Sequence, residues 1–184
     1  THMGTLKYNL TLVRGLHFEL TDTWEDKDYD VSFIEKKDDG TSVEIYSTKL
    51  RKGHWAKINR RYLSNIIIEI WDKIDPIAHV LKETINVKNQ LKGKRVFISF
   101  ESKSLGDTVA WIPYCLQFQE KYKCKVIVST FKNDLFESVY PELEFVGRGV
   151  TVDNIQAILQ FNQITMYRNT LSGPLSTDST LWLN

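Results

Sequence analysis

Short stretches in the first 72 residues alternate between apolar and polar positions. A period of two residues is typical of strands that have one face in a core. The stretches that we assign to strands are 9–13, 16–20, 29–35, 42–47, 54–59 and 66–71. Asp38-Asp39-Gly40, between the third and fourth of them, is a hairpin turn signal. The pattern predicts an antiparallel, β-sandwich-like domain over residues 5–74.

A different pattern, in which strands alternate with helices, begins at residue 94. Arg95–Phe100 is a short apolar run rich in β-branched and aromatic residues, which indicates a buried strand. The other elements that we expect are a helix at 107–122, a strand at 125–129, a short helix at 133–139 capped by Asn133, a strand at 144–146 and a helix at 155–161. This alternation predicts a Rossmann-like parallel α/β lobe over residues 94–160. Residues 161–184 are left unassigned.

Residues 75–93 form the predicted linker between the two domains. Residues 76–84 fit a short helix, whereas residues 80–87 fit one more strand, and the sequence leaves both interpretations open. Strand-type alternation stops at about Asp72, and strand–helix alternation begins at Lys94. We therefore expect two compact units that meet between these two residues.

The predicted helix at 107–122 has apolar residues at three- and four-residue spacing, so one face is expected to pack on the sheet. The positions on that face are Val109, Ile112, Cys115 and Leu116. Pro113 lies inside the pattern and predicts a kink or an early end of the helix. Ser104 or Asp107 can cap the first turn. The strand core is expected at Val96, Ile98, Phe100, Val126 and Val128.

The composition is that of an ordinary globular protein, with 42% hydrophobic and 26% charged residues among 184. The net charge of +1 gives no general affinity for polyanions. The basic residues at 49–52 and 60–61 are interpreted as a solvated face rather than a nucleic-acid site. No apolar run approaches the about 18 residues that a membrane span needs. Neither nucleic acid nor membrane is an expected partner.

Cys115 and Cys124 are the only cysteines in the chain. On one helix they would be about 13 Å apart, which is too far for a disulfide. Two reduced thiols fit a cytoplasmic protein. No pair among His17, His54 and His79 has metal-ligand spacing, and the cysteines lie elsewhere. No metal site is expected.

Asp107 stands at the turn between the first strand and the first helix of the α/β lobe. Ligands of such domains bind at the carboxyl ends of the strands, so this carboxylate is placed where chemistry usually occurs. A helix cap is the plainer interpretation of an isolated aspartate at this position. Gly106 favours either a turn conformation or the close approach of a ligand to the backbone, and both interpretations stay open.

Several segments of the α/β lobe resemble a known family when they are taken in order. The tetrapeptide SLGD at 104–107, followed by an apolar helix with Pro113, resembles the first turn of the ADP-heptose heptosyltransferases. The longer strings SKSLGDTVAWIPY, CKVIVSTFKNDLF and YPELEFV resemble the bacterial autotransporter strand-loop-strand O-heptosyltransferases. The resemblance covers roughly residues 10–152. It implies the acceptor-binding half of a GT-B glycosyltransferase, whose donor-binding lobe lies outside this chain.

The resemblance also implies a reaction and a set of site residues. The aspartate of this motif is the general base of the resembled enzymes, so Asp107 would deprotonate a serine or threonine hydroxyl that receives heptose. The residues expected to contact acceptor or donor are Ser104, Leu105, Gly106, Thr108, Thr130 and Lys132. The implied partners are an autotransporter passenger, a nucleotide-sugar donor of the ADP-heptose type and further copies in a homo-oligomer. The chain itself is expected to hold no cofactor.

A non-catalytic interpretation stays open beside the enzymatic one. Some of the resembled enzymes carry an iron site built from cysteines in their carboxyl-terminal half, and Cys115 and Cys124 do not match it. The chain could instead be a binding or assembly module without transferase activity. A reading frame that continues past Asn184 into a second lobe favours the enzyme, and a natural stop favours the module. The expected absence of the donor-binding lobe leaves the activity of the isolated chain open.

Overall fold

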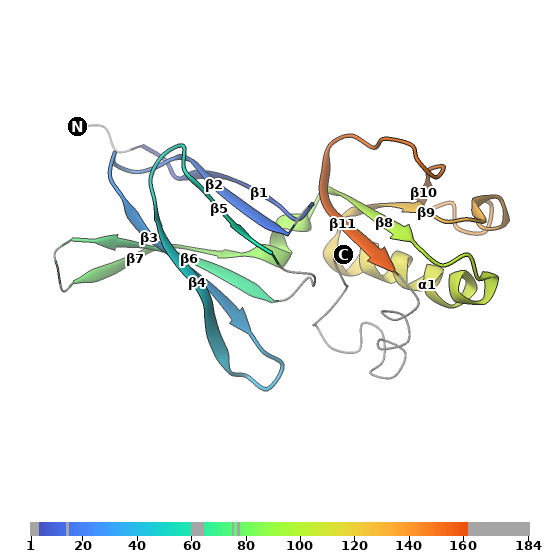
Figure 1. The fold of residues 1–184 in the computed structure, drawn as a ribbon, viewed down its shortest axis with the longest axis horizontal. Coiled ribbons are helices and arrows are strands. Elements are labelled where there is room, and N and C mark those ends of the chain that lie inside the picture. The colour runs from blue at the N-terminus through green and yellow to red at the C-terminus, as the bar shows by residue number, and fades with distance from the viewer. Residues whose placement is uncertain (1–3, 14, 60–64, 75, 77, 162–184) are drawn as a thin grey trace. The chain divides into compact units, whose positions relative to one another are not determined.

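The computed structural model describes residues 4–13, 15–59, 65–74, 76 and 78–161 (Figure 1). It divides the described chain into two compact units, with the division between Lys88 and Asn89. The unassigned tail at 161–184 lies outside the described residues except for Phe161. Each unit has its own hydrophobic core.

The described residues of the first unit form seven strands in two antiparallel sheets. Their bounds are β1 Lys7–Thr11, β2 Leu16–Asp22, β3 Tyr29–Lys36, β4 Ser42–Leu50, β5 Trp55–Ile58, β6 Ile66–Lys73 and β7 His79–Asn86. One sheet has the order β1-β2-β5, and the other has the order β4-β3-β6-β7. The predicted antiparallel part of the fold is therefore confirmed.

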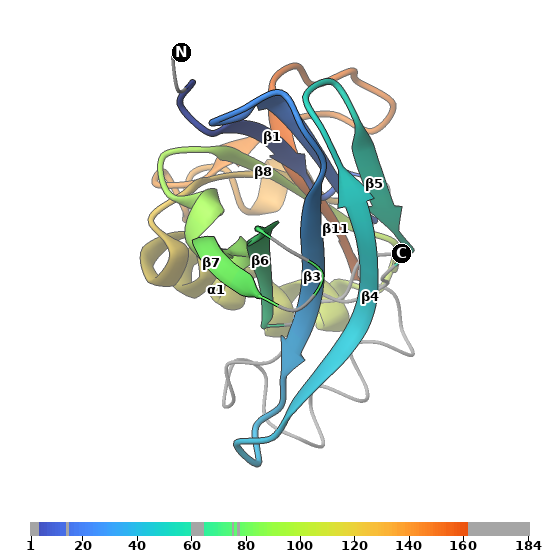
Figure 2. The same ribbon diagram turned by 90° about the vertical axis from the view of Figure 1, so that its left-hand side faces the viewer.

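Strict alternation of buried and half-exposed residues builds the core of this unit. Along β3, Tyr29, Val31 and Phe33 are buried, and the residues between them are not. Phe18 of β2 packs edge-on against Phe33 at 6.1 Å between ring centroids, so aromatic side chains of the two sheets meet in one core. The hairpin between β3 and β4 turns at Gly40, whose φ of 86° suits glycine (Figure 2).

The predicted linker at 75–93 is not a linker in its first half. β7 pairs with β6 along its length, for example Ile85 opposite Ile68, and becomes the edge strand of the larger sheet. The strand interpretation was thus the right one of the two alternatives. A 3₁₀ helix, η1 at Val87–Leu91, follows directly and buries Leu91.

In the second unit, the described residues form a four-stranded parallel sheet with the order β10-β9-β8-β11 (Figure 1). Its elements are β8 Arg95–Phe100, α1 Leu105–Tyr122, β9 Lys125–Ser129, the 3₁₀ helix η2 Asn133–Leu135, β10 Glu144–Phe145 and β11 Ile155–Phe161. The predicted strand core is confirmed, because Val96 pairs with Val126, and Ile98 with Val128, in adjacent parallel strands. All four side chains, and that of Phe100, are fully buried.

Two of the secondary-structure elements predicted in this unit are wrong. Residues 155–161 are a strand, because they pair in parallel with β8 on the side opposite β9. The helix predicted at 133–139 is only the single turn η2, and the side chain of Asn133 does not cap it. The amide of Asn133 instead donates to the Val146 carbonyl at 2.7 Å, and its oxygen accepts from Thr130.

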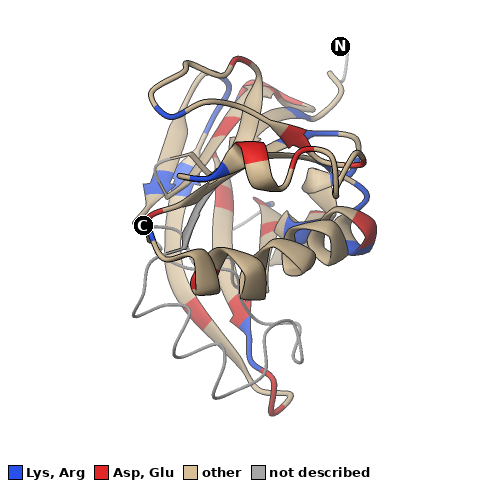
Figure 3. Ribbon diagram, turned by 90° about the vertical axis from the view of Figure 1, so that its right-hand side faces the viewer, with Lys and Arg blue, Asp and Glu red and all other residues tan. Residues whose placement is uncertain are grey.

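The predicted buried face of helix α1 is right for Ile112 and Cys115 and wrong for Val109 and Leu116. The buried residues of the helix are Thr108, Trp111, Ile112, Cys115 and Phe118. Val109 is 54% exposed, and the helix continues through Pro113 to Tyr122. Pro113 has no N–H to donate to the carbonyl of Val109, so the helix continues without that hydrogen bond. Figure 3 shows the front of α1 without charge along most of its length, with charged residues near its C-terminal end.

Both cysteines are free and buried in the second unit. Burial raises the pKa of the Cys115 thiol, and burial raises the pKa of the Cys124 thiol to about 12. We expect neither thiol of the native chain to react with Ellman's reagent at pH 7.5, and both to react in denaturant. Because the folded state keeps these protons, the free energy of unfolding should fall as the pH rises above about 9. Fast labelling without denaturant would contradict this burial.

Candidate functional site

The order of the parallel strands locates a candidate site. β8 lies between β9 and β11, and the chain reaches β9 first, through α1, before it returns to β11 on the other side. Open α/β sheets bind ligands outside the carboxyl ends of the strands where the order reverses in this way. Residues 101–104 leave β8 at that point and lead into α1 (Figure 1).

A chain of hydrogen bonds holds the Asp107 carboxylate at this edge. The backbone N–H of Ser104 donates to Ser102 Oγ at 3.1 Å, and Ser102 Oγ donates to Asp107 Oδ2 at 2.6 Å. Asp107 is half-buried. In the part of the chain that the structure describes, its other oxygen, Oδ1, makes no hydrogen bond or ion pair. One oxygen is thus fixed, and the other can accept a proton.

Ser104 caps α1, so the cap interpretation does not apply to the side chain of Asp107. Ser104 Oγ accepts from the backbone N–H of Asp107 at 3.3 Å, which is the usual bond of an N-cap serine to the third residue of a helix. Thr108 is 1% exposed, and its hydroxyl donates to the Ser104 carbonyl at 3.0 Å. Thr108 therefore fixes the cap and lies out of reach of a ligand.

Leu105 and Gly106 form the exposed surface of the first helical turn. Leu105 is 46% exposed. Gly106 does not have a positive φ, and a Cβ built on it would meet only Ser104 Oγ, at 3.7 Å. The turn-conformation interpretation of Gly106 is therefore wrong. The close approach of a ligand to its backbone stays a prediction.

A Gly106→Ala substitution tests that interpretation. The structure has room for the methyl group, and alanine favours helix by up to about 1 kcal/mol over glycine. We expect an unchanged or slightly raised melting temperature, and weaker binding of whatever ligand lies against this turn. The measurement pairs a thermal melt with KM for the donor and the acceptor that the family resemblance implies, in the full-length protein. Unchanged KM values for both substrates would exclude close contact at Gly106.

Thr130 and Lys132 lie in the turn after β9, at the carboxyl edge of the same sheet. Thr130 is 2% exposed, and its hydroxyl donates to Asn133 Oδ1 at 2.7 Å and accepts from the N–H of Lys132 at 3.0 Å. The hydroxyl of Thr130 is therefore occupied by the turn. The half-buried side chain of Lys132 is the one of the two that can reach outward.

Arg148 contacts residues at the carboxyl ends of β8 and β9, and the sequence analysis did not indicate it. Its guanidinium lies 4.0 Å from the centroid of the Phe131 ring and donates to the carbonyl of Phe100 at 2.7 Å. It also pairs with Glu101 at 3.4 Å. Lys103 Nζ lies 5.6 Å from the same ring centroid. These contacts brace the segment that leaves β8 just before Ser102.

Sequence reasoning missed Ser102 and Arg148 for different reasons. Ser102 precedes the cap serine by two residues, and its bond to Asp107 becomes visible only when the turn is folded. Arg148 follows β10, whose carboxyl end lies at the same edge of the sheet as that of β8. The shared edge of parallel strands was the one signal that could have indicated Arg148.

Comparison with known proteins gives relatives of one kind. No protein-family model matches the chain. The autotransporter heptosyltransferase TibC of Escherichia coli is 29% identical over 103 residues, which cover 55% of this chain and 24% of TibC. The autotransporter heptosyltransferase Aah of Escherichia coli is 30% identical over 98 residues, which cover 52% of this chain and 24% of Aah. This chain is a homologue of the autotransporter heptosyltransferases.

The homology covers only part of each relative. The matched part of the chain spans 24% of the length of TibC and of Aah. A third heptosyltransferase homologue, BimC of Burkholderia thailandensis, is 38% identical over 56 residues, covering 29% of this chain and 13% of BimC, and is described as inactive. The predicted resemblance is confirmed, and the relatives TibC and Aah are glycosyltransferases.

A solved structure of TibC shares the fold of this chain. A crystal structure of TibC with ADP-D-β-D-heptose matches it with a TM-score of 0.58 at 18% identity, over 88% of this chain and 40% of TibC. Likeness at this identity shows the fold alone. The mixed α/β architecture with antiparallel and parallel sheets is thereby confirmed. Among the described residues, no helix is long and apolar enough to cross a membrane.

Proposed function

We propose that this chain is the acceptor-binding, N-terminal portion of a glycosyltransferase. In this proposal the enzyme transfers heptose from a nucleotide-activated donor to serine or threonine hydroxyls of an autotransporter adhesin. The homology to TibC and Aah supports the heptosyl transfer, and the ADP-heptose complex of TibC supports a donor of that type. Asp107 is the proposed general base.

The arrangement of the Asp107 carboxylate is the observation that carries this assignment. A hydroxyl that attacks an anomeric carbon must lose its proton as the new bond forms, and a carboxylate within hydrogen-bond reach can accept it. Ser102 Oγ fixes Asp107 Oδ2 at 2.6 Å and leaves Oδ1 for the acceptor hydroxyl. The hydrogen bond from Ser102 thus orients the carboxylate and leaves the lone pairs of Oδ1 able to accept a proton.

The sheet order supports a Rossmann-like lobe of the GT-B type. In chain order the strands run third, second, first, fourth across the sheet, which is the first part of the dinucleotide-binding order. In this proposal a second lobe binds the nucleotide of the donor and faces the edge that carries Asp107. Donor phosphates would then approach the first turn of α1 at Leu105 and Gly106.

The same proposal includes an oligomer in the cytoplasm. The solved TibC structure is described as dodecameric, which supports assembly from several copies. TibC is also described as iron-containing. The described residues do not fit an iron site, because they hold no group of three or more His, Cys, Asp or Glu side chains that could share a metal ion. Cys115 and Cys124 are buried with raised pKa values, which disfavours the thiolate form that binds metals.

Release of ADP tests the transferase directly. The full-length protein is incubated with ADP-heptose, with and without an autotransporter passenger, and ADP is quantified over time. We expect ADP release that depends on the passenger. TibC serves as the positive control for substrates and conditions. Passenger-independent release, or none at all beside an active TibC, would contradict the proposed reaction.

A non-catalytic assembly or binding role is the second candidate. The homology to BimC, which is described as an inactive heptosyltransferase, favours it. A module of this kind would bind the passenger or other copies of the protein and release no ADP. Binding of the passenger without ADP release would therefore support this second function over the first.

A further inference from the structure

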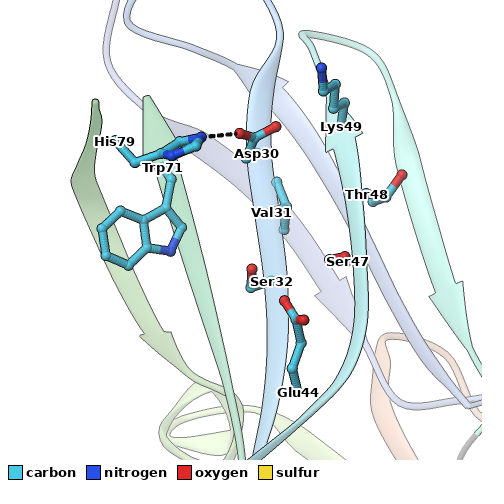
Figure 4. Close-up of a pocket in the computed structure, with 9 residues that line it drawn as sticks. All are labelled: Asp30, Val31, Ser32, Glu44, Ser47, Thr48, Lys49, Trp71 and His79. Atoms are coloured by element: carbon cyan, nitrogen blue, oxygen red, sulfur yellow. Dashed lines mark hydrogen bonds and ion pairs between the residues drawn. The ribbon is translucent and has the colours of Figure 1, made fainter. Parts of the chain in front are cut away.

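A hollow of about 560 Å³ lies on the outer face of the larger sheet in the first unit (Figure 4). β3 forms its floor, β4 forms one wall, and β6 and β7 form the other. The side chains that line it include Asp30, Ser32, Glu44, Ser47, Trp71 and His79. This hollow contains none of the residues assigned to heptosyl transfer.

The pleat of β3 aims polar groups into this hollow. Tyr29, Val31 and Phe33 are buried in the core, so Asp30 and Ser32 stand on the opposite face. Asp30 Oδ2 lies 2.8 Å from His79 Nε2, which links the floor to the β7 wall. The pair restricts both side chains and leaves the second oxygen of Asp30 available.

Several polar groups around the hollow are not used by the protein itself. In the part of the chain that the structure describes, the side chains of Ser32, Glu44, Ser47 and Trp71 make no hydrogen bond to another residue. Figure 4 shows the Glu44 carboxylate extending from the β4 wall toward the floor, close to Ser32. The indole of Trp71 presents a flat apolar surface beside them (Figure 4). An apolar platform among unpaired donors and acceptors is suited to a polyhydroxylated ring.

Strand pairing and charge narrow the class of ligand. β3 and β6 are central strands that are hydrogen-bonded on both sides, so a peptide cannot join the sheet at this floor. Asp30 and Glu44 face a single Lys49, which leaves a formal charge of −1 when His79 is neutral. That charge disfavours phosphorylated and nucleotide ligands.

We propose that this hollow binds a neutral saccharide. The C–H face of the sugar ring lies on the Trp71 indole, and the Asp30 and Glu44 carboxylates accept hydrogen bonds from its hydroxyls. Ser32 and Ser47 supply further hydrogen bonds at the floor and the β4 wall. The proposal goes beyond heptosyl transfer and does not depend on Asp107, so either can fail while the other holds.

Titration of the ¹⁵N-labelled chain with methyl glycosides of mannose, glucose and heptose tests the proposal. We expect saturable shifts of the Trp71 indole N–H and of β3 and β4 amides with at least one of them. Mannose 6-phosphate should bind at least about tenfold more weakly than methyl mannoside. Equal binding of the phosphorylated sugar would overturn the charge argument, and no saturable shift with any saccharide would overturn the proposal.

Three variants locate the binding and control for folding. Trp71→Ala and Glu44→Gln should each weaken binding by about tenfold or more. Glu44 is exposed, so its substitution keeps the test valid if Trp71→Ala fails to fold. Trp55→Ala removes a 56%-exposed indole from the other sheet and should leave the affinity unchanged. A trimethyllysine probe that binds where the saccharides do not would identify a cation site and contradict the proposal.

Discussion

Turnover of the full-length protein should fall by about 10²–10⁴-fold in the variant Asp107→Asn, the usual contribution of a positioned general base. Asparagine has the same size, and its amide oxygen can still accept from Ser102 Oγ. It cannot remove a proton from an acceptor hydroxyl. The measurement is the rate of ADP release in the presence of the passenger.

The fold should hardly change in this variant, because Ser104 and not Asp107 caps α1. Loss of a negative charge in the first turn costs about 0.3–1 kcal/mol through the helix dipole. Thermal unfolding of the variant and the wild type serves as the control. Turnover above about a third of the wild-type rate would refute the catalytic role of Asp107.

The largest stability effect is expected for Ile98→Ala in the centre of the parallel sheet. Ile98 is fully buried, and it pairs with Val128 of β9 on one side and with Leu159 of β11 on the other. Removal of its side chain leaves a cavity between packed strands. The substitution should lower the free energy of unfolding of the second unit by about 2–5 kcal/mol in a urea titration.

An exposed valine provides the matched control for this loss. Val139 is 62% exposed, so Val139→Ala should change the free energy of unfolding by no more than about 0.5 kcal/mol. A loss below about 1 kcal/mol for Ile98→Ala would mean that β8 is not the central strand. Equal losses for both variants would contradict the assigned core in the same way.

The sequence predicted correctly those strands that bury one face in a single core. In β3 and β6 the buried residues recur at every second position, and the sequence pattern alone indicates both strands. β11 was missed because Ile155, Ile158 and Leu159 have helical spacing. Pairing with the free edge of β8 determines that this segment is a strand, and such a long-range contact leaves no local signal.

The sequence predicted where the candidate site lies, but not which hydrogen bonds its side chains make. The resemblance indicated Asp107, and the strand-to-helix turn gave its location at the carboxyl edge of the sheet. The sequence could not show that the hydroxyls of Thr108 and Thr130 are bonded within their own turns. Nor could it show that Ser102 orients Asp107, because hydroxyl partners depend on the folded path of the loop.

The mass of an autotransporter passenger tests the central claim most directly. The passenger is co-expressed with the full-length protein, or with its Asp107→Asn variant, in cells that make ADP-heptose, and its intact mass is measured. Heptose additions on serine or threonine with the wild-type protein, and almost none with the variant at equal soluble levels, are the predicted result. An unmodified passenger with both proteins, or an equally modified one, would contradict the account.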